Sequence, residues 1–128
     1  MIVAPLSVIA QSFNGAKLKG GVWYRNEVND KEKITMVFTD TQFSLTYSEC
    51  TFGPWVSESH SFPYYLSDTV PTEFDNTKVG KSTKGKYLIW INLLDYRFYA
   101  ETITELTDNS FKIINPVNLK ETYTKKAK

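Results

Sequence analysis

The sequence predicts an all-β protein, a single antiparallel up-and-down β-barrel of about eight strands. Short segments of alternating apolar and polar residues recur along the chain at roughly 10-residue spacing. No segment has the apolar spacing of an amphipathic helix. Aromatic residues make up 15% of the chain, and a closed sheet leaves no open edge from which they could cause aggregation. Adjacent hairpins favour up-and-down order because strands that are neighbours in sequence usually pair.

In the first half of the chain, four strands are expected. Residues 17–26 predict the first strand, and the period-two segments at residues 34–39 and 43–48 predict a hairpin with one buried face. Residues 59–67 form the fourth candidate, in which Pro63 indicates a sheet edge or a bulge because proline lacks the N–H that a ladder needs.

The second half predicts a long loop followed by the most apolar strand. Residues 70–74 give a weak strand signal that Pro71 interrupts, and residues 75–86 show no periodicity. Residues 87–94 are apolar on both faces except at Asn92. The remaining strands are expected at residues 96–106, 111–114 and 119–124, before a frayed tail at residues 125–128.

The chain of 128 residues suits one domain. We assign residues 17–128 to the barrel and residues 1–16 to an N-terminal arm. Residues 1–11 contain a short apolar run that ends in small residues, as at a signal-peptidase site, although no Lys or Arg precedes it. The arm is therefore a signal remnant, the result of a mis-set start or a genuine mature N-terminus, and we expect a secreted, periplasmic or cell-envelope protein. No run of apolar residues is long enough to span a bilayer.

Charge argues against nucleic acid as a partner. The formal net charge is +1, so no strong positive field is available. Four lysines near Tyr87 and Trp90 could suit single-stranded nucleic acid, which needs cations and stacking surfaces. Lysines in a Gly/Ser/Thr-rich loop are more often simply solvated. The four lysines of this loop are Lys78, Lys81, Lys84 and Lys86.

The residue types that carry catalysis do not converge, so we expect no enzyme and no cofactor. Cys50 and His60 are each the single residue of their kind, which gives at most an isolated nucleophile–base pair. Glu58 and His60 share a strand face, but zinc needs three or four ligands, so no metal is expected. The pair Glu101 and Glu105 is expected at solvated strand positions rather than in a catalytic cleft.

The interior of the barrel is the candidate ligand site. Tyr87, Ile89 and Ile91 lie on one face of their strand, while Leu88, Trp90 and Asn92 lie on the other, and either set could face inward. We expect a small hydrophobic ligand, with Asn92 or tyrosine hydroxyls orienting it. The alternative is a filled core, in which loop 75–86 meets a partner protein. The predicted ligand-binding residues are Phe38, Tyr47, Tyr65, Trp90, Asn92 and Phe98.

Three segments carry a resemblance to a known family. Residues 18–23, which contain Gly21-Val22-Trp23, resemble the Gly-x-Trp opening of lipocalin-like (calycin) domains, particularly the small bacterial secreted members. Residues 34–41 and 103–111 are similar to the second strand and the penultimate hairpin of those domains. The resemblance implies that Gly21 and Trp23 close one end of the barrel and that any ligand lies at the opposite end. It also implies a basic residue from a late strand over Trp23, for which the candidates are Arg97, Lys112 and Lys120.

Overall fold

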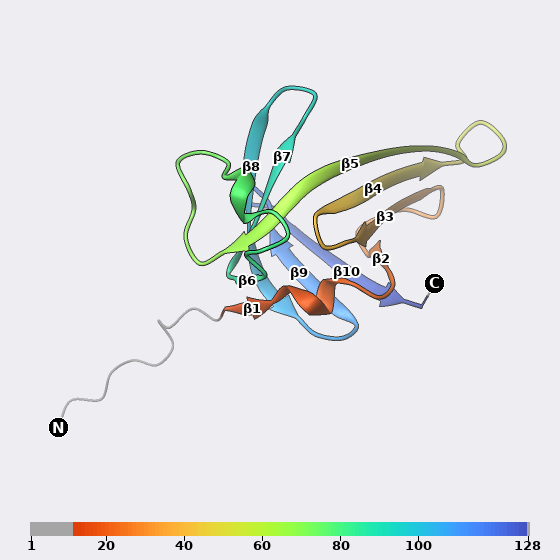
Figure 1. Cartoon of the computed structure of the whole chain (residues 1–128). Coiled ribbons are helices and arrows are strands. Elements are labelled where there is room, and N and C mark those ends of the chain that lie inside the picture. Colours follow the sequence, from red (N-terminus) through yellow and green to blue (C-terminus); the bar gives the residue numbers. More distant parts are fainter. Residues whose placement is uncertain (1–11, 128) are drawn as a thin grey trace.

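The computed structural model describes residues 12–127, which form a closed antiparallel barrel (Figure 1). The strands follow one another around the barrel in chain order, and the last strand closes on the first, so the predicted up-and-down barrel is confirmed. The strands are β2 (Val22–Arg25), β3 (Glu32–Phe38), β4 (Gln42–Glu49), β5 (Val56–Ser67), β7 (Tyr87–Asn92), β8 (Arg97–Leu106), β9 (Ser110–Ile114) and β10 (Lys120–Lys126).

Short elements outside the barrel are β1 (Phe13–Asn14), which pairs with β6 (Lys84–Gly85), and two 3-10 helices, η2 (Gly15–Leu18) and η3 (Asn76–Lys78). The predicted strand at residues 17–26 is therefore wrong over its first half. The Asn14 side chain accepts a hydrogen bond from the Ala16 N–H and caps η2, which competes with extended structure there. Residues 13–16, expected in the arm, thus contact the barrel, while the possible signal remnant at residues 1–11 lies outside the described residues. The described part of the chain has no helix with the length and apolarity to cross a membrane.

Trp23 closes one end of the barrel. Its side chain is fully buried, its indole N–H donates to the Leu18 carbonyl at 2.8 Å, and its ring lies 5.6 Å from that of Phe111. Gly21 precedes it where the chain passes β10, and a Cβ there would stand 2.6 Å from the Lys126 carbonyl oxygen. The structure therefore places Gly21 and Trp23 at a closed end of the barrel, which we call the Trp23 end.

The basic residue over Trp23 is Lys125. Its Nζ lies 5.1 Å from the centre of the Trp23 ring and donates to the carbonyl oxygens of Lys17 (2.8 Å) and Lys19 (2.6 Å). The expected frayed tail is wrong for residues 125 and 126, since β10 continues to Lys126 and pairs with β2. Residue 128 lies outside the described part of the chain. The three residues predicted to lie over Trp23 are also wrong, because Lys125 lies over its ring instead. These were Arg97, Lys112 and Lys120.

Strand β5 changes partners at Pro63. Residues 56–63 pair with β4, and the ladder with β7 begins at Tyr64. Pro63 therefore lies where the strand leaves an edge position, and its missing N–H costs no ladder bond on the β7 side. The expected edge is present, but no bulge interrupts the strand. As a result β3, β4 and β5 run on together beyond the point where β7 joins (Figure 1).

A second apolar layer lies on the outside of the barrel. Tyr65 and Ile89 are 1% and 0% exposed, and the loop after β5 covers them. Phe74 of this loop lies 5.1 Å from the Tyr65 ring, and the Asp75 N–H donates to the Tyr65 hydroxyl at 3.3 Å. The weak strand expected at residues 70–74 is absent, because this segment serves as a cover rather than a sheet member.

Candidate functional site

A cavity of about 230 Å³, partly open to solvent, lies inside the barrel beyond the Trp23 end. The residues around it alternate along their strands with outward-facing neighbours, as the period of two requires. Six strands contribute to its wall. The lining residues are Arg25, Ile34, Met36, Phe43, Leu45, Trp90, Glu101, Glu121 and Tyr123.

One wall of the cavity is aromatic and aliphatic. The Trp90 ring stacks on Tyr99 at 4.7 Å and 29°, and it lies 4.8 Å from Phe62 and 5.6 Å from Phe43. Contacts on several sides hold the indole in one orientation. This wall offers a fixed flat surface to an apolar or aromatic group.

Next to this wall lies a buried carboxyl group, that of Glu101 on the neighbouring strand β8, which is 8% exposed. Burial, followed by the negative charge of Glu121, raises the pKa of Glu101 to about 8. A hydrogen bond from Trp90 and the charge of Arg25 act in the opposite direction without cancelling the effect. At neutral pH Glu101 is therefore mainly protonated. A carboxyl perturbed in this way inside a cavity is typical of a functional site.

Glu121 and Tyr123 form the adjoining part of the polar wall. The Tyr123 hydroxyl donates to Glu121 Oε1 at 2.8 Å, and the Asn115 amide donates to Glu121 Oε2 at 2.9 Å. Burial and then the charge of Glu121 raise the pKa of Tyr123, so the phenol keeps its proton. The Glu121 carboxylate is thus held in place by two donors beside Glu101.

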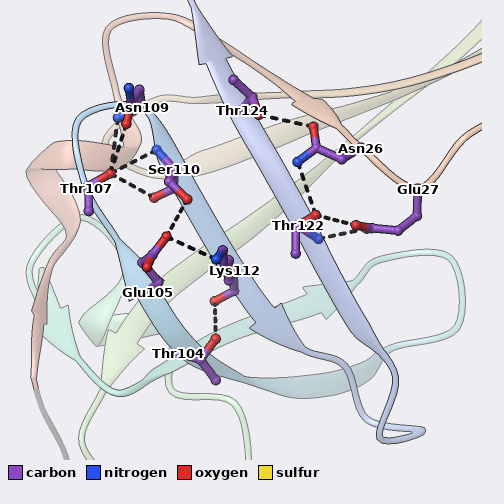
Figure 2. A network of polar contacts seen from close by, with 10 residues as sticks. All are labelled: Asn26, Glu27, Thr104, Glu105, Thr107, Asn109, Ser110, Lys112, Thr122 and Thr124. Atoms are coloured by element: carbon purple, nitrogen blue, oxygen red, sulfur yellow. Dashed lines mark hydrogen bonds and ion pairs between the residues drawn. The ribbon is translucent and has the colours of Figure 1, made fainter.

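Arg25 is the one positively charged side chain among the described residues of the cavity wall. Its Nε is buried, has no hydrogen-bond partner in the described part of the chain, and lies 3.6 Å from Glu27 Oε1. Glu27 in turn accepts hydrogen bonds from the Thr122 backbone N–H at 2.8 Å and from its hydroxyl, as Figure 2 shows. Burial acts to raise the pKa of Glu27, but these hydrogen bonds and the Arg25 charge outweigh it and lower the pKa. Glu27 therefore stands as a carboxylate beside Arg25.

Further acidic residues lie on the inward face of β3, β4 and β5, beyond the cavity. We call Glu32, Glu49 and Glu58 the outer acidic group. The Tyr47 hydroxyl donates to Glu32 at 2.9 Å and to Glu49 at 3.4 Å, and the hydrogen bond to Glu32, followed by partial burial, raises the pKa of Tyr47 to about 12. Glu32 lies two residues, roughly 7 Å, past the cavity residue Ile34 on β3, and the register pairs it with Glu49.

Of the six residues predicted to bind a ligand, Trp90 lines the cavity and the other five do not. Phe38 faces inward but lies in the core, 6.1 Å from Phe111 and 5.3 Å from Tyr64. Tyr47 lies with the outer acidic group, and the Asn92 side chain accepts from the Leu94 N–H at 2.9 Å to shape the β7–β8 turn. Tyr65 and Phe98 were expected to face inward, and both expectations are wrong. The loop after β5 covers Tyr65, and Phe98 pairs with Ile91 on the outer face of the barrel.

The other eight lining residues were not predicted to bind a ligand, and four of them carry its polar groups: Arg25, Glu101, Glu121 and Tyr123. The expectation that Glu101 is solvated is wrong, because it lies between inward-facing Tyr99 and Ile103 on β8. Glu105 does lie at the surface, where Ser110 and Lys112 contact it (Figure 2). The two-residue period of a strand could have indicated that these side chains face inward. Arg25 is two residues after buried Trp23, and Glu101 is two residues before buried Ile103.

The other chemical candidates do not come together. His60 Nε2 lies 3.0 Å from Glu58 Oε1, and residues 12–127 hold no group of three His, Cys, Asp or Glu side chains placed to bind a metal. In the lysine-rich loop, Lys78 and Lys86 lie over the rings of Tyr65 and Tyr87. A smaller hollow of about 140 Å³ lies between η2 and residues 82–83. Its two charged side chains, Lys19 and Asp40, form an ion pair with each other.

No protein-family model matches the chain, and comparisons with curated proteins and with solved structures gave no significant match. The functional argument therefore depends on the cavity itself. Its lining suits a small amphipathic molecule that places an apolar part against Trp90 and a polar part against the neighbouring carboxyl groups.

Proposed function

We propose that this protein is a lipocalin-like binding barrel that holds a small, partly hydrophobic ligand in the cavity beyond the Trp23 end. The single observation that carries the proposal is the mixed lining of the cavity, in which the Trp90 wall adjoins the buried carboxyl of Glu101. A preformed hollow lined by apolar groups and a few converging polar ones is typical of small-molecule sites.

The volume supports a compact ligand. An apolar cavity of about 150 Å³ accommodates benzene, and the present cavity measures about 230 Å³. A single ring with a short substituent fits such a space, whereas most of a long acyl chain would extend outside it. The alternative function, a partner-binding barrel with a filled core, expects no internal hollow, so the cavity favours the ligand-binding proposal.

Tryptophan fluorescence tests the proposal, because Trp90 lines the cavity while Trp23 is sealed in the closed end. Titration with compact aromatic compounds is expected to shift the emission of the protein. The shift should disappear in Trp90→Phe and persist in Trp55→Phe, since Trp55 is 43% exposed.

Two further variants locate the site. Leu45→Phe adds bulk to the cavity wall and is expected to weaken binding at least tenfold. Val37→Phe makes the same kind of addition on the outer face of the neighbouring strand β3 and should leave binding unchanged. If no compact compound alters Trp90 emission, or if both variants bind as the parent does, the proposed function is wrong.

A further inference from the structure

We propose that the ligand is a small organic cation, with an ammonium-type group facing Glu101 and Glu121 and an apolar body against Trp90. This inference depends on the proposed function and specifies the ligand class of that same cavity. It is carried by the acidic residues of the wall, by the buried carboxyl of Glu101 and by the aromatic surface beside it.

The charge of the wall becomes negative when Glu101 ionises. Glu101 and Glu121 both line the cavity, while Arg25 is its one cationic residue among those described. Arg25 already faces the Glu27 carboxylate at 3.6 Å, so most of its charge is compensated outside the cavity. Ionised Glu101 would add a second negative charge next to Glu121. A ligand cation supplies the opposite charge that a buried carboxylate pair requires.

Glu101 also has unused hydrogen-bonding capacity. It is nine-tenths buried, and the contact described above with Trp90 uses one of the four lone-pair positions of a carboxylate. An alkylammonium group brings up to three donors, and a quaternary ammonium brings charge without donors. Both place a positive charge beside Glu101, which opposes the effects of burial and of the Glu121 charge on its pKa.

The aromatic wall fits the same ligand class. Trp90 is the aromatic side chain that attracts cations most strongly, and stacking on Tyr99 at 4.7 Å fixes its orientation. A cation in contact with both the aromatic wall and the neighbouring carboxyl groups would gain from both.

The outer acidic group extends this field toward solvent. Glu32, Glu49 and Glu58 lie on the inward face of the strands that lead to the cavity, although the whole chain has a net charge of +1. Negative charge is thus concentrated on this face. Such an arrangement steers cations and gives an association rate that falls with added salt.

Arg25 is the observation that would favour an anion instead. Its buried Nε lacks a hydrogen-bond partner in the described chain, and a ligand carboxylate could accept from it. That carboxylate would stand near the carboxylates of Glu27 and Glu121, however, and like charges repel. We therefore treat Arg25 as the ion-pair partner of Glu27. The carboxyl groups of Glu101 and Glu121 are then the groups that contact the ligand.

Cation binding should release the proton of Glu101. The charged and titratable groups that face it are Arg25 from β2, Trp90 as a donor from β7, Tyr99 on its own strand, and Glu121 and Tyr123 from β10. The affinity for a permanently charged cation is expected to rise up to tenfold per pH unit below about pH 8 and to level off above it.

The decisive experiment compares three probes of similar size by calorimetry and Trp90 fluorescence at pH 8. Benzyltrimethylammonium is the cation, neopentylbenzene is its uncharged carbon isostere, and phenylacetate is the anion. We expect the cation to bind at least tenfold more tightly than either of the other two. Equal binding of the neutral isostere, or tighter binding of phenylacetate, overturns this inference while the proposed function stands. Binding of none of the three contradicts both.

Variants then assign the charge to Glu101. Glu101→Gln keeps the shape of the side chain and is expected to weaken cation binding at least tenfold while leaving the neutral isostere unaffected. Glu105→Gln, on the same strand but at the surface, is the matched control and should change neither affinity. An unchanged cation affinity in Glu101→Gln refutes the assignment. If that variant fails to fold, the pH dependence of cation binding in the parent protein decides, and a flat profile between pH 6 and 8 refutes it equally.

Discussion

The buried carboxyl of Glu101 should make the stability of the protein fall as the pH rises through the neutral range. Its pKa is about 8 in the folded protein against an ordinary value of 4.5. Folding therefore favours the protonated form, since burial and Glu121 both disfavour the charge. Below about pH 4.5 the group is protonated in both states and has no effect. Between pH 4.5 and 8 the unfolded chain gives up its proton first, so the folded state becomes progressively less stable.

The magnitude follows from the difference between the two pKa values. At about 1.4 kcal/mol per pKa unit, the shift from 4.5 to about 8 corresponds to a loss of up to about 5 kcal/mol by pH 8. That is a large part of the total stability of a small domain, which is typically about 5–15 kcal/mol. The loss should be readily measurable by urea unfolding.

The assay compares parent and Glu101→Gln by urea unfolding at intervals from pH 5 to 9. The variant should lack most of the decline and be the more stable protein at pH 8. Carboxyls with lowered pKa, such as Glu27 and Asp75, act only under more acidic conditions and do not overlap this window. Glu105→Gln should keep the slope of the parent. Parallel profiles for the parent and Glu101→Gln would refute the argument that Glu101 is buried without adequate compensation.

Two further predictions concern the Trp23 end and are measured by the same unfolding assay. Lys125→Met keeps an aliphatic cover over Trp23 but removes the bonds to the carbonyls of Lys17 and Lys19, so a loss of about 1–3 kcal/mol is expected. Lys126→Met is the control, and an equal loss there would contradict the assigned role of Lys125. Gly21→Ala places a Cβ 2.6 Å from the Lys126 carbonyl oxygen and should cost more than about 2 kcal/mol. Gly20→Ala should cost only about 1–2 kcal/mol for its φ of 95°, since open space surrounds it, and the reverse order would refute the close-approach argument.

Much of the fold could be predicted because strand patterning is local. The segments near residues 34–39 and 43–48 alternate so regularly that β3 and β4 were expected close to their observed bounds. The segment at residues 17–26 was misassigned because the Asn14 cap and the burial of Leu18 select η2 there. The tail was expected to fray because its lysines look solvated, whereas Lys125 has carbonyl partners more than 100 residues away in sequence.

The site was less predictable, because alternation shows which residues share a face and not which face turns inward. Trp90 was correctly placed on the cavity, while Tyr65 was assigned to the interior although an outer loop buries it. An apolar residue on either face of β5 can be buried, since one face meets the core and the other meets residues 68–83. Glu101 presented the converse difficulty, since a charged residue in a strand is usually solvated.

The sequence by itself determined the strand pattern and the up-and-down barrel, because these depend on local alternation and on pairing between neighbours along the chain. Only the tertiary structure decided which side chains share the interior. Barrel closure pairs β10 with β2 and so brings Glu121 and Tyr123 next to Arg25, nearly 100 residues apart in sequence. That closure also removes the Glu101 carboxyl from water, and this burial gives the cavity its acidic character.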